Sequence, residues 1–543
     1  MRHFSFLIFL ILGNINIHAT DYYFHPKTGS NSNTGLTEVD AFKTLDALQN
    51  IKLKAGDRIL LASEVVHFGS IKIVDTDGTK EKPIKILSHS WLGQAMKTEK
   101  AIIDFKGMDT GILIENSSNV SIENLAITGN GHGQELNSNA MSCGILITSS
   151  KTGEMNHIAV KDLFIYDIFN KNQGFVRGAE EVRTANGTQA YGWGIRVKSL
   201  CEKGFVAKIK IENTKVQNVG HTGVKLTGKN GNIHDVEILN NHVLFTGGPG
   251  IQMSSVKDVH VEGNVVKHSG SNDDSRKWGR GSGLWTWGSS NVLIERNKFL
   301  FANGPGDSTG AHIDYNCENI VIQYNLSAYN AGGFCEILGN NYNCIYRFNV
   351  SVNDGWRVKD ENGAFQEGKI FWLSGYQGNH RVEKGPVNTY FYNNTIYTDG
   401  SYTPKIAIEK TSNGILIANN IFAVNGKTKL VEEDQYGSEK VKDQIVKNVF
   451  FSNNIFISHD SWPEDIYPSD TNPIYGDPKF LNPNGLSLES YIPNNIELVS
   501  KGIFIQKMQN DSNSIGAKNN HTMFYDILDQ EIKNLKFIGA IKP

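Results

Sequence analysis

Short stretches in which apolar and polar residues alternate recur along most of the chain, and each ends at an asparagine. In VHVEGNVV the stretch closes at Asn264, and in VLIERNKF it closes at Asn297. Alternation with a period of two is typical of β-strands that bury one face. The closing residues are Asn213, Asn241, Asn264, Asn297, Asn325, Asn349, Asn394, Asn420 and Asn454, at intervals of 23 to 45 residues.

Repeats of this length with several short strands each predict a β-solenoid. We expect an all-β, single-stranded right-handed parallel β-helix. Asparagine suits the bend between strands because it tolerates left-handed backbone conformations, and stacked side chains can bond the Asn of the next coil. Near the start, Phe42, Leu45 and Leu48 have helical spacing, which predicts an N-terminal helix capping the core.

Composition agrees with many strands and tight turns and limits the function. The chain has 543 residues, with 54 Gly, 13 Pro and a formal net charge of −3. This charge indicates no nucleic-acid partner, because a general nucleic-acid binder carries an excess of Lys and Arg. Five cysteines are too few for a disulfide scaffold and match no zinc pattern, so we expect them in the core, with one bridge at most. No metal site is predicted from them.

The first residues, MRHFSFLIFLILGNINIHA, have a basic start, a short apolar stretch and a small residue at Ala19. This pattern predicts a secretory signal over residues 1–19 and an exported protein, periplasmic or extracellular, without membrane insertion. We expect an N-terminal cap and first coils over 20–110, a β-helix body over 111–480, and a last coil and cap over 481–543. The mature protein is expected to be a monomer.

Both ends of the mature chain carry recognisable segments: Tyr22-Tyr23, Gly29-Ser30, Ala41–Leu45, Gly56–Ile59, Gly476–Phe480 and Ile515–Ala517. With these segments the chain resembles secreted bacterial right-handed parallel β-helix proteins that act on polysaccharides, such as glycoside hydrolases and polysaccharide lyases. The resemblance covers nearly the whole mature chain. It implies the fold and a polysaccharide partner, but it does not choose a reaction.

One face of the solenoid is expected to carry cations and aromatic rings. In GIRVK, GVKLT and GIQMS, apolar residues at the second and fourth positions point inward, so their neighbours point outward. The predicted outward residues are Arg196, Lys198, Lys225, Gln252, Trp285 and Trp287. Aromatic rings and cations together suit an anionic sugar polymer, although a solvated sheet face would also carry Lys and Arg.

The alternation breaks in AHIDYN and CEILGN, where His312, Asp314 and Glu336 take positions that were apolar in earlier repeats. Either the strand shifts by one residue and presents them outward, or they are buried and paired at a cost. The shift is the cheaper explanation, and it places Glu336 one coil beyond His312. Asp307, in the preceding turn, can overhang the same place. We therefore predict a catalytic site here, the alternative being a structural His and Asp network.

Three long inserts flank this face, at 170–194, 269–283 and 354–372. Loops on a rigid scaffold often carry binding residues, so we expect Trp278, Arg280 and Trp356 to help wall a substrate cleft. Ordinary variation in insert length is the alternative for each loop.

Three functions remain open. The first is a glycoside hydrolase of acidic or sulfated polysaccharides that uses Asp314 and Glu336 and needs no cofactor. The second is a polysaccharide lyase with Lys225, Lys198 or Arg196 in catalysis, in which Ca²⁺ is held by Asp307 or Asp314 and Glu336. The third is a non-catalytic carbohydrate-binding solenoid.

Overall fold

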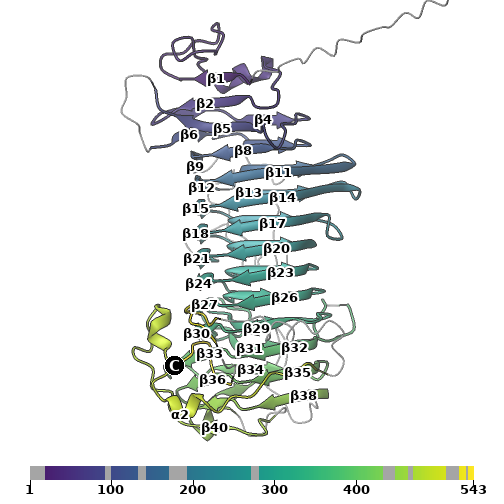
Figure 1. The fold of residues 1–543 in the computed structure, drawn as a ribbon, viewed down its shortest axis with the longest axis vertical. Helices are drawn as coiled ribbons and strands as arrows, with labels where there is room; N and C mark the ends of the chain where they lie inside the picture. Colours follow the sequence, from purple (N-terminus) through teal and green to yellow (C-terminus); the bar gives the residue numbers. More distant parts are fainter. Residues whose placement is uncertain are drawn as a thin grey trace, which may run out of the picture.

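The computed structural model describes residues 19–91, 99–131, 142–169, 192–270, 280–378, 380–431, 447–462, 469–508, 525–532 and 536–543. The predicted signal segment therefore lies outside the described residues, apart from Ala19. The chain winds into a tall stack of coils, whose strands form three parallel sheets (Figure 1). The predicted all-β parallel β-helix is confirmed.

A twelve-stranded sheet forms one face of the stack. Its strands are β4 (Ile71–Val74), β7 (Thr110–Glu115), β10 (Ser142–Ser149), β13 (Gly192–Ser199), β16 (Val224–Thr227), β19 (Ile251–Ser254), β22 (Leu284–Trp287), β25 (Ala311–Ile313), β28 (Gly333–Ile337), β31 (Lys369–Leu373), β34 (Lys405–Ile408) and β37 (Lys429–Leu430).

A fourteen-stranded sheet, called the β1-sheet, follows in each coil. Its strands are β1 (Asp21–Phe24), β2 (Arg58–Ala62), β5 (Ile84–His89), β8 (Val120–Glu123), β11 (Gly153–Lys161), β14 (Gly204–Glu212), β17 (Ile233–Leu239), β20 (Val256–Glu262), β23 (Ser290–Glu295), β26 (Glu318–Gln323), β29 (Ile345–Arg347), β32 (Val387–Tyr392), β35 (Asn413–Ala418) and β38 (Lys447–Ser452).

A second fourteen-stranded sheet, called the β3-sheet, completes each coil. Its strands are β3 (Val66–Phe68), β6 (Ala101–Asp104), β9 (Leu125–Gly131), β12 (Phe164–Ile168), β15 (Lys215–Val219), β18 (His242–Thr246), β21 (Val265–Ser269), β24 (Lys298–Leu300), β27 (Leu326–Ala328), β30 (Val350–Val352), β33 (Thr395–Thr398), β36 (Ile421–Val424), β39 (Ile455–Phe456) and β40 (Ile474–Tyr475).

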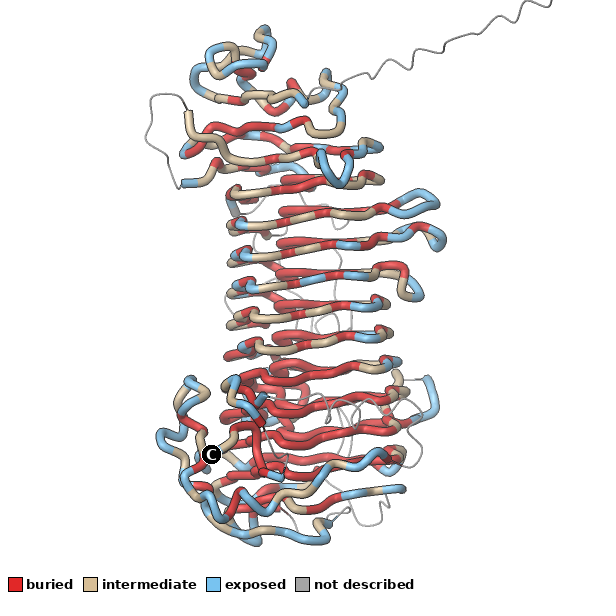
Figure 2. The backbone as a smooth tube through the Cα atoms, in the orientation of Figure 1, coloured by how far each residue is buried: buried red, intermediate tan, exposed pale blue. Residues whose placement is uncertain are grey.

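The core is a continuous cluster of buried apolar side chains along the coils. Buried residues recur along the strands of successive coils (Figure 2). In β16, Val224 and Leu226 are fully buried and pair with Ile251 and Met253 of the next coil, which are also buried. Because side chains alternate along a strand, the intervening residue Lys225 points to the outer face. The two-residue alternation in the sequence therefore identifies both faces correctly.

A ladder of buried asparagines runs between the β1-sheet and the β3-sheet. The Nδ2 group of Asn264 donates to Oδ1 of Asn297 at 2.9 Å, and Nδ2 of Asn297 donates to Oδ1 of Asn325 at 3.0 Å. The same bond continues from Asn325 through Asn349, Asn394, Asn420 and Asn454 and ends on Asp470. The ladder satisfies amide groups that are buried at every bend, as the repeat predicts.

Two details of the predicted ladder are wrong. The left-handed residue is the one that precedes the ladder asparagine, as with Arg296 (φ 56°) before Asn297. At the start of the ladder, Asn213 itself has a positive φ, and Thr214 takes the ladder position, where its N–H donates to Oδ1 of Asn241 at 3.0 Å. The bend needs one left-handed residue followed by one inward polar side chain.

The predicted N-terminal capping helix is also wrong. The structure has a six-residue 3-10 helix at Leu45–Asn50, and no helix among the described residues reaches seven residues. Phe42 forms a parallel bridge with Phe24, so the backbone is extended where the helical spacing begins. Phe42 and Leu45 nevertheless cover the end of the core, because both are buried. No described helix is both long and apolar enough to cross a membrane.

The C-terminal segment packs along the outside of the last coils (Figure 1). It includes the helix α2 (Ile496–Val499) and residues 536–543. The N–H of Gly539 donates to the carbonyl of Asn419 at 2.8 Å, and that of Ala540 donates to Oγ1 of Thr395 at 3.0 Å. The cysteines form no disulfide, and four of the five are buried.

We predict that Asn297→Ala lowers the free energy of unfolding by about 2–4 kcal/mol, because it leaves the buried amide of Asn264 without its acceptor. Urea denaturation followed by circular dichroism measures this change. Asn303→Ala is the control, because Asn303 is exposed and its replacement should change stability by less than about 0.5 kcal/mol. Equal effects of the two substitutions would show that the ladder adds no stability.

Candidate active site

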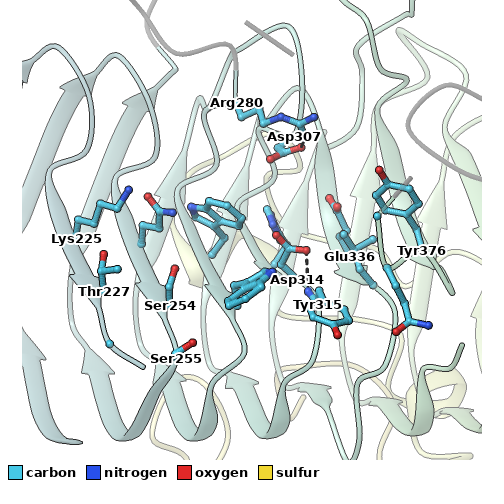
Figure 3. Close-up of a pocket in the computed structure, with 18 of the residues that line it drawn as sticks. Lys225, Thr227, Ser254, Ser255, Arg280, Asp307, Asp314, Tyr315, Glu336 and Tyr376 are labelled. Carbon is cyan, nitrogen blue, oxygen red and sulfur yellow. Dashed lines mark hydrogen bonds and ion pairs between the residues drawn. The ribbon is translucent and has the colours of Figure 1, made fainter. Parts of the chain in front are cut away.

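A pocket of about 470 Å³ lies on the outer face of the twelve-stranded sheet (Figure 3). It extends across strands from β13 to β28 and includes the turn before β25 and the loop after β31. Many of the predicted site residues line it. They are Arg196, Lys225, Gln252, Trp285, Trp287, His312, Asp314, Glu336 and, in the turn before β25, Asp307. Arg280, from the second predicted insert, also lines it.

Backbone pairing arranges most of these side chains in one column along the solenoid. The pairs Arg196–Lys225, Lys225–Gln252, Gln252–Trp285 and Trp285–His312 are each in direct register. Ile313 pairs with Ile337, so Glu336 follows His312 in this column. Neighbouring members are about 4.8 Å apart in the backbone, the spacing of hydrogen-bonded strands. The predicted shift of the strand by one residue is confirmed.

The shift comes from one extra residue beside β25. Thr286 pairs with Ile313, and Ser290 pairs with Glu318, so four residue steps in one coil match five in the next. The added residue falls at Asp314 and Tyr315, because the N–H of Gly288 donates to the carbonyl of Tyr315 at 2.8 Å. Such an insertion re-aims side chains locally, and here it gives Asp314 access to the pocket.

His312 is a buried, neutral imidazole between two hydroxyl groups. Its Nδ1 lies 3.0 Å from Oγ of Ser282 and 2.8 Å from Oγ1 of Thr309. Its ring lies 5.6 Å from that of Trp285. Burial lowers the pKa of His312 to about 4, so the ring is uncharged at neutral pH. A neutral imidazole held at Nδ1 can make one further hydrogen bond through Nε2.

Glu336 is a buried carboxyl on β28, with 3% of its surface exposed. Among the described residues, no group bonds its Oε1 atom. Burial raises the pKa of Glu336 well above its usual range, and the charge of Asp307 raises it further. Lys369 and Arg357 act in the opposite direction but do not reverse the shift. The shift favours the protonated form of Glu336 when the pocket holds no substrate.

Asp314 lies diagonally from Glu336 in the sheet, and both carboxyl groups face the pocket (Figure 3). Their backbone positions are about 8 Å apart at standard strand spacings. One oxygen of Asp314 accepts the N–H of Tyr315 at 2.7 Å. Burial of the carboxyl raises the pKa of Asp314 to about 7, with a further contribution from Asp307. Asp314 therefore changes its charge near neutral pH.

Asp307 forms a buried ion pair with Arg280, whose Nη1 donates to its Oδ1 at 2.7 Å. Nη1 of Arg357 donates to the main-chain carbonyl of Asp307 at 3.0 Å, and Gln366 accepts the Asp307 N–H. This network fixes the turn before β25. Asp307 therefore supplies a fixed negative charge next to Asp314 and Glu336, and Arg280 holds this carboxylate.

Two predicted binding residues among those the structure describes, Trp356 and Lys198, do not line the pocket. Trp356 turns away from it, since its Nε1 donates to the carbonyl of Tyr329 at 3.2 Å beside the β3-sheet. Lys198 is half-buried on β13 next to Arg196, in register with Thr227. Trp278 lies outside the described residues. Arg357, the residue after Trp356, is the part of that insert that reaches the site through Asp307.

Sequence reasoning missed several polar residues that line the pocket. Tyr315 follows Asp314 at the inserted position, and its ring lies 5.7 Å from that of Trp287. Tyr376 and Gln377 come from the loop after β31. Aligning the repeats identifies positions within strands only. The loop after β31 lies outside the repeat, so its pocket residues could not be recognised in this way. Tyr315 could have been found, because it is the residue that breaks the alternation.

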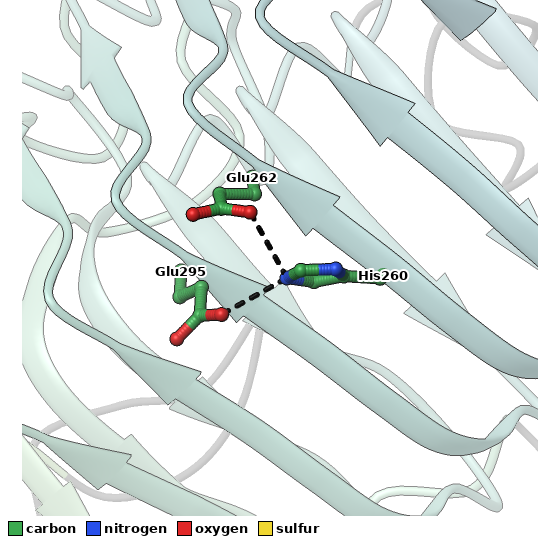
Figure 4. Close-up of side chains that lie close together, drawn as sticks. All are labelled: His260, Glu262 and Glu295. Carbon is green, nitrogen blue, oxygen red and sulfur yellow. Dashed lines mark hydrogen bonds and ion pairs between the residues drawn. The ribbon is translucent and has the colours of Figure 1, made fainter. Parts of the chain in front are cut away.

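His260, Glu262 and Glu295, residue types that can bind metal ions, lie close together on the outer face of the β1-sheet (Figure 4). Nε2 of His260 lies 2.9 Å from Oε1 of Glu295 and 3.6 Å from Oε2 of Glu262. Glu295 raises the pKa of His260, so the three form an ion-paired cluster. Within the described residues, Asp307, Asp314 and Glu336 do not form such a convergent group.

The pocket thus combines an acid, a carboxyl that titrates near neutral pH, a neutral imidazole and two indole rings. Two carboxyl groups with different environments are what a glycosidic bond needs for proton donation and nucleophilic or base attack.

We predict that Asp314 makes stability depend on pH. Its pKa is about 7 in the folded protein and 3.8 ordinarily, so the folded state binds the extra proton and stability falls as pH rises from about 4 to 7. Asp314→Asn should therefore raise the free energy of unfolding at pH 8 by about 1–3 kcal/mol, with little gain at pH 4. Urea denaturation across this range measures it, and a gain that is the same at every pH would contradict the assignment.

Known protein families and solved structures that resemble this chain have the same type of fold. Residues 194–378 match the family model described as "Right handed beta helix region". The crystal structure of a GH136 lacto-N-biosidase from Eubacterium ramulus is 17% identical, with a TM-score of 0.50, over 84% of this chain and 68% of that chain. No curated protein matches the sequence.

Two further solved structures show weaker likeness. The complex of XylC with xylose is 12% identical over 96% of this chain and 98% of that chain, with a TM-score of 0.48. A mannuronic acid specific polysaccharide family 6 lyase from human gut microbiota is 13% identical over 84% and 82%, with a TM-score of 0.44. At these identities the comparisons concern the fold alone. The chain contains a right-handed β-helix domain, and the pocket lies on the part that matches the family model.

Proposed function

We propose that the protein is an exported glycoside hydrolase that cleaves an acidic or sulfated polysaccharide with Asp314 and Glu336. The observation that carries the proposal is that these two carboxyl groups lie on adjacent coils, face one pocket and both have raised pKa values. A structural carboxylate would be bonded or exposed, whereas Oε1 of Glu336 is buried and has no partner among the described residues. An acidic group kept protonated near neutral pH suits proton donation to a leaving oxygen.

Glu336 is assigned as the general acid, because it is the more deeply buried of the two and its Oε1 has no partner among the described residues. Asp314 is assigned as the base or nucleophile, since it titrates near pH 7 and keeps partial access to solvent. When Asp314 is ionised, its charge further favours the protonated form of Glu336. His312 would then hydrogen-bond the sugar through Nε2 without adding charge.

The rest of the pocket supports a sugar polymer lying along the solenoid axis. Trp285 and Trp287 present their rings beside His312 and Asp314, where an apolar sugar face can stack. Hydroxyl groups of Thr227 and Ser254 line the pocket toward Lys225. These groups provide both the apolar platform and the hydrogen bonds that sugar recognition needs.

A polysaccharide lyase is the second candidate, favoured by Lys225. Burial lowers the pKa of Lys225 to about 7, and Arg196 stands beside it in register, so a base and a cation are adjacent. The form of this reaction in which Ca²⁺ is held by Asp314 and Glu336 fits poorly. Lys225 is three coils from His312, about 14 Å, which is more than one sugar ring spans.

Incubation with a panel of acidic algal and animal polysaccharides tests the two candidates. We expect reducing ends to accumulate without new ultraviolet absorbance, because hydrolysis adds water and leaves no double bond. Absorbance that rises with the reducing ends would identify a lyase. Binding without either product would leave a non-catalytic carbohydrate-binding solenoid.

Glu336→Gln and Asp314→Asn should each lower kcat by about 10³-fold or more, because each removes one half of the acid and base pair. Initial rates of reducing-end release measure this loss. Glu318→Gln is the matched control, since Glu318 is exposed on the β1-sheet and should keep full activity. Retention of activity in either site variant, with the fold intact by circular dichroism, would remove that residue from the mechanism.

A further inference from the structure

Lys225 is a buried lysine that has no anionic partner among the described residues. Only 4% of its surface is exposed, and it lines the pocket on the outer face of β16. Among the described residues, no hydrogen bond or ion pair engages its ammonium group. A buried charge without a counter-charge is expensive, so such a side chain is rarely kept for stability. The amino group of Lys225 is therefore placed to receive an anionic group of a ligand in the pocket.

The neighbours of Lys225 add positive charge instead of compensating it. Arg196 pairs with it in the sheet and is 8% exposed, and Lys198 stands two residues further along the same strand as Arg196. The guanidinium of Arg196 stacks over the ring of Trp193 at 4.2 Å, which fixes its plane. Two cations held side by side in a partly enclosed pocket match a carboxylate or sulfate group.

We propose that Lys225 and Arg196 form a subsite for one anionic group of the substrate, remote from the bond that is cleaved. The distance comes from the register: Gln252 and Trp285 occupy the two coils between Lys225 and His312, and Glu336 lies one coil beyond. The anion therefore binds about 14 Å from His312, several sugar units from the catalytic pair. The buried Oε1 of Gln252, which no described group bonds, is free to accept a sugar hydroxyl between them.

Apolar clusters limit the groove at both ends. Beyond Arg196, the next outward residue in register is Leu146, which packs with Cys143 and Trp193. Beyond Glu336, it is Trp372, which packs with Leu338, Ala407 and Val431. The polar part of the column thus runs from Arg196 to Glu336. The anionic subsite lies at one end of it, and the catalytic pair lies at the other.

The position of the anion relative to the cleaved bond rests on the proposed hydrolase function. The binding of an anion by Lys225 and Arg196 does not depend on that function. Isothermal titration calorimetry of the whole protein at constant ionic strength tests it with sodium glucuronate, glucose 6-sulfate and glucose as probes. We expect glucuronate or the sulfate to bind with a Kd of about 1–10 mM, and glucose to bind at least tenfold more weakly. Which of the two charged sugars binds more tightly distinguishes a carboxylate from a sulfate ligand.

Lys225→Met separates the subsite from a structural role, because it keeps the length of the side chain and removes the charge. We expect this variant to bind the charged sugar at least tenfold more weakly, and to unfold at a higher temperature than the unmodified protein when no anion is present. Lys210→Met, on the β1-sheet, is the control and should change neither binding nor melting temperature appreciably. Equal binding of glucose and glucuronate, or unchanged binding in Lys225→Met, would overturn the subsite.

Kinetics with a cleaved acidic polysaccharide then test the placement. Lys225→Met should raise KM about tenfold or more with little change in kcat, since the lysine is remote from the reacting atoms. A collapse of kcat would place Lys225 at the reaction itself and overturn the remote position. If anions bind but no polysaccharide is hydrolysed, the subsite stands and the proposed hydrolase fails. If hydrolysis occurs without preferential binding of anions, the reverse holds.

Discussion

The stacking of coils in strict register is the constraint on which the rest of the molecule depends. Main-chain hydrogen bonds hold neighbouring strands about 4.8 Å apart, and the buried asparagine ladder fixes each bend against the next. Because every coil repeats the same path, a residue at one position of a strand lies directly beside its counterpart in the adjoining coil. A long, flat surface is therefore encoded by single positions that are 23 to 45 residues apart in sequence.

Several ionisable side chains that line the pocket are buried, and their burial opposes folding. Among the described residues, Lys225 is buried with no anionic partner, Oε1 of Glu336 is buried with no hydrogen-bond partner, and His312 is kept neutral. Such burial is tolerated because the ladder and the apolar core hold the backbone independently of these side chains. In the pocket wall, Asp307 and Arg280 form an ion pair, and the charge of Asp307 raises the pKa of both Asp314 and Glu336. The division between a stable scaffold and a strained surface is typical of functional sites.

The sequence predicted the fold and the position of the pocket, because both follow from the repeat. Alternation identified the inward residues, and the loss of alternation at His312, Asp314 and Glu336 located the pocket. Features outside the repeat could not be predicted in this way. Tyr376 enters from an irregular loop, and Trp356 was assigned to the cleft although its indole bonds the carbonyl of Tyr329 elsewhere. The capping helix failed because helical spacing over a few residues cannot outweigh a strand bridge at Phe42.

The single residue added beside β25 shows how such a surface changes. In a sheet, a one-residue slip reverses which side chains face the core, and ordinarily this would disrupt the strand. Here the slip is absorbed within the corner at Asp314 and Tyr315, and pairing resumes at Glu318 without disturbing the asparagine ladder. The next coil keeps the added residue, since Ile313 pairs with Ile337 and Val321 pairs with Ile345, so one change of corner length turns polar side chains outward on both coils. The length of one corner can therefore decide which side chains face outward, while the buried ladder keeps its place.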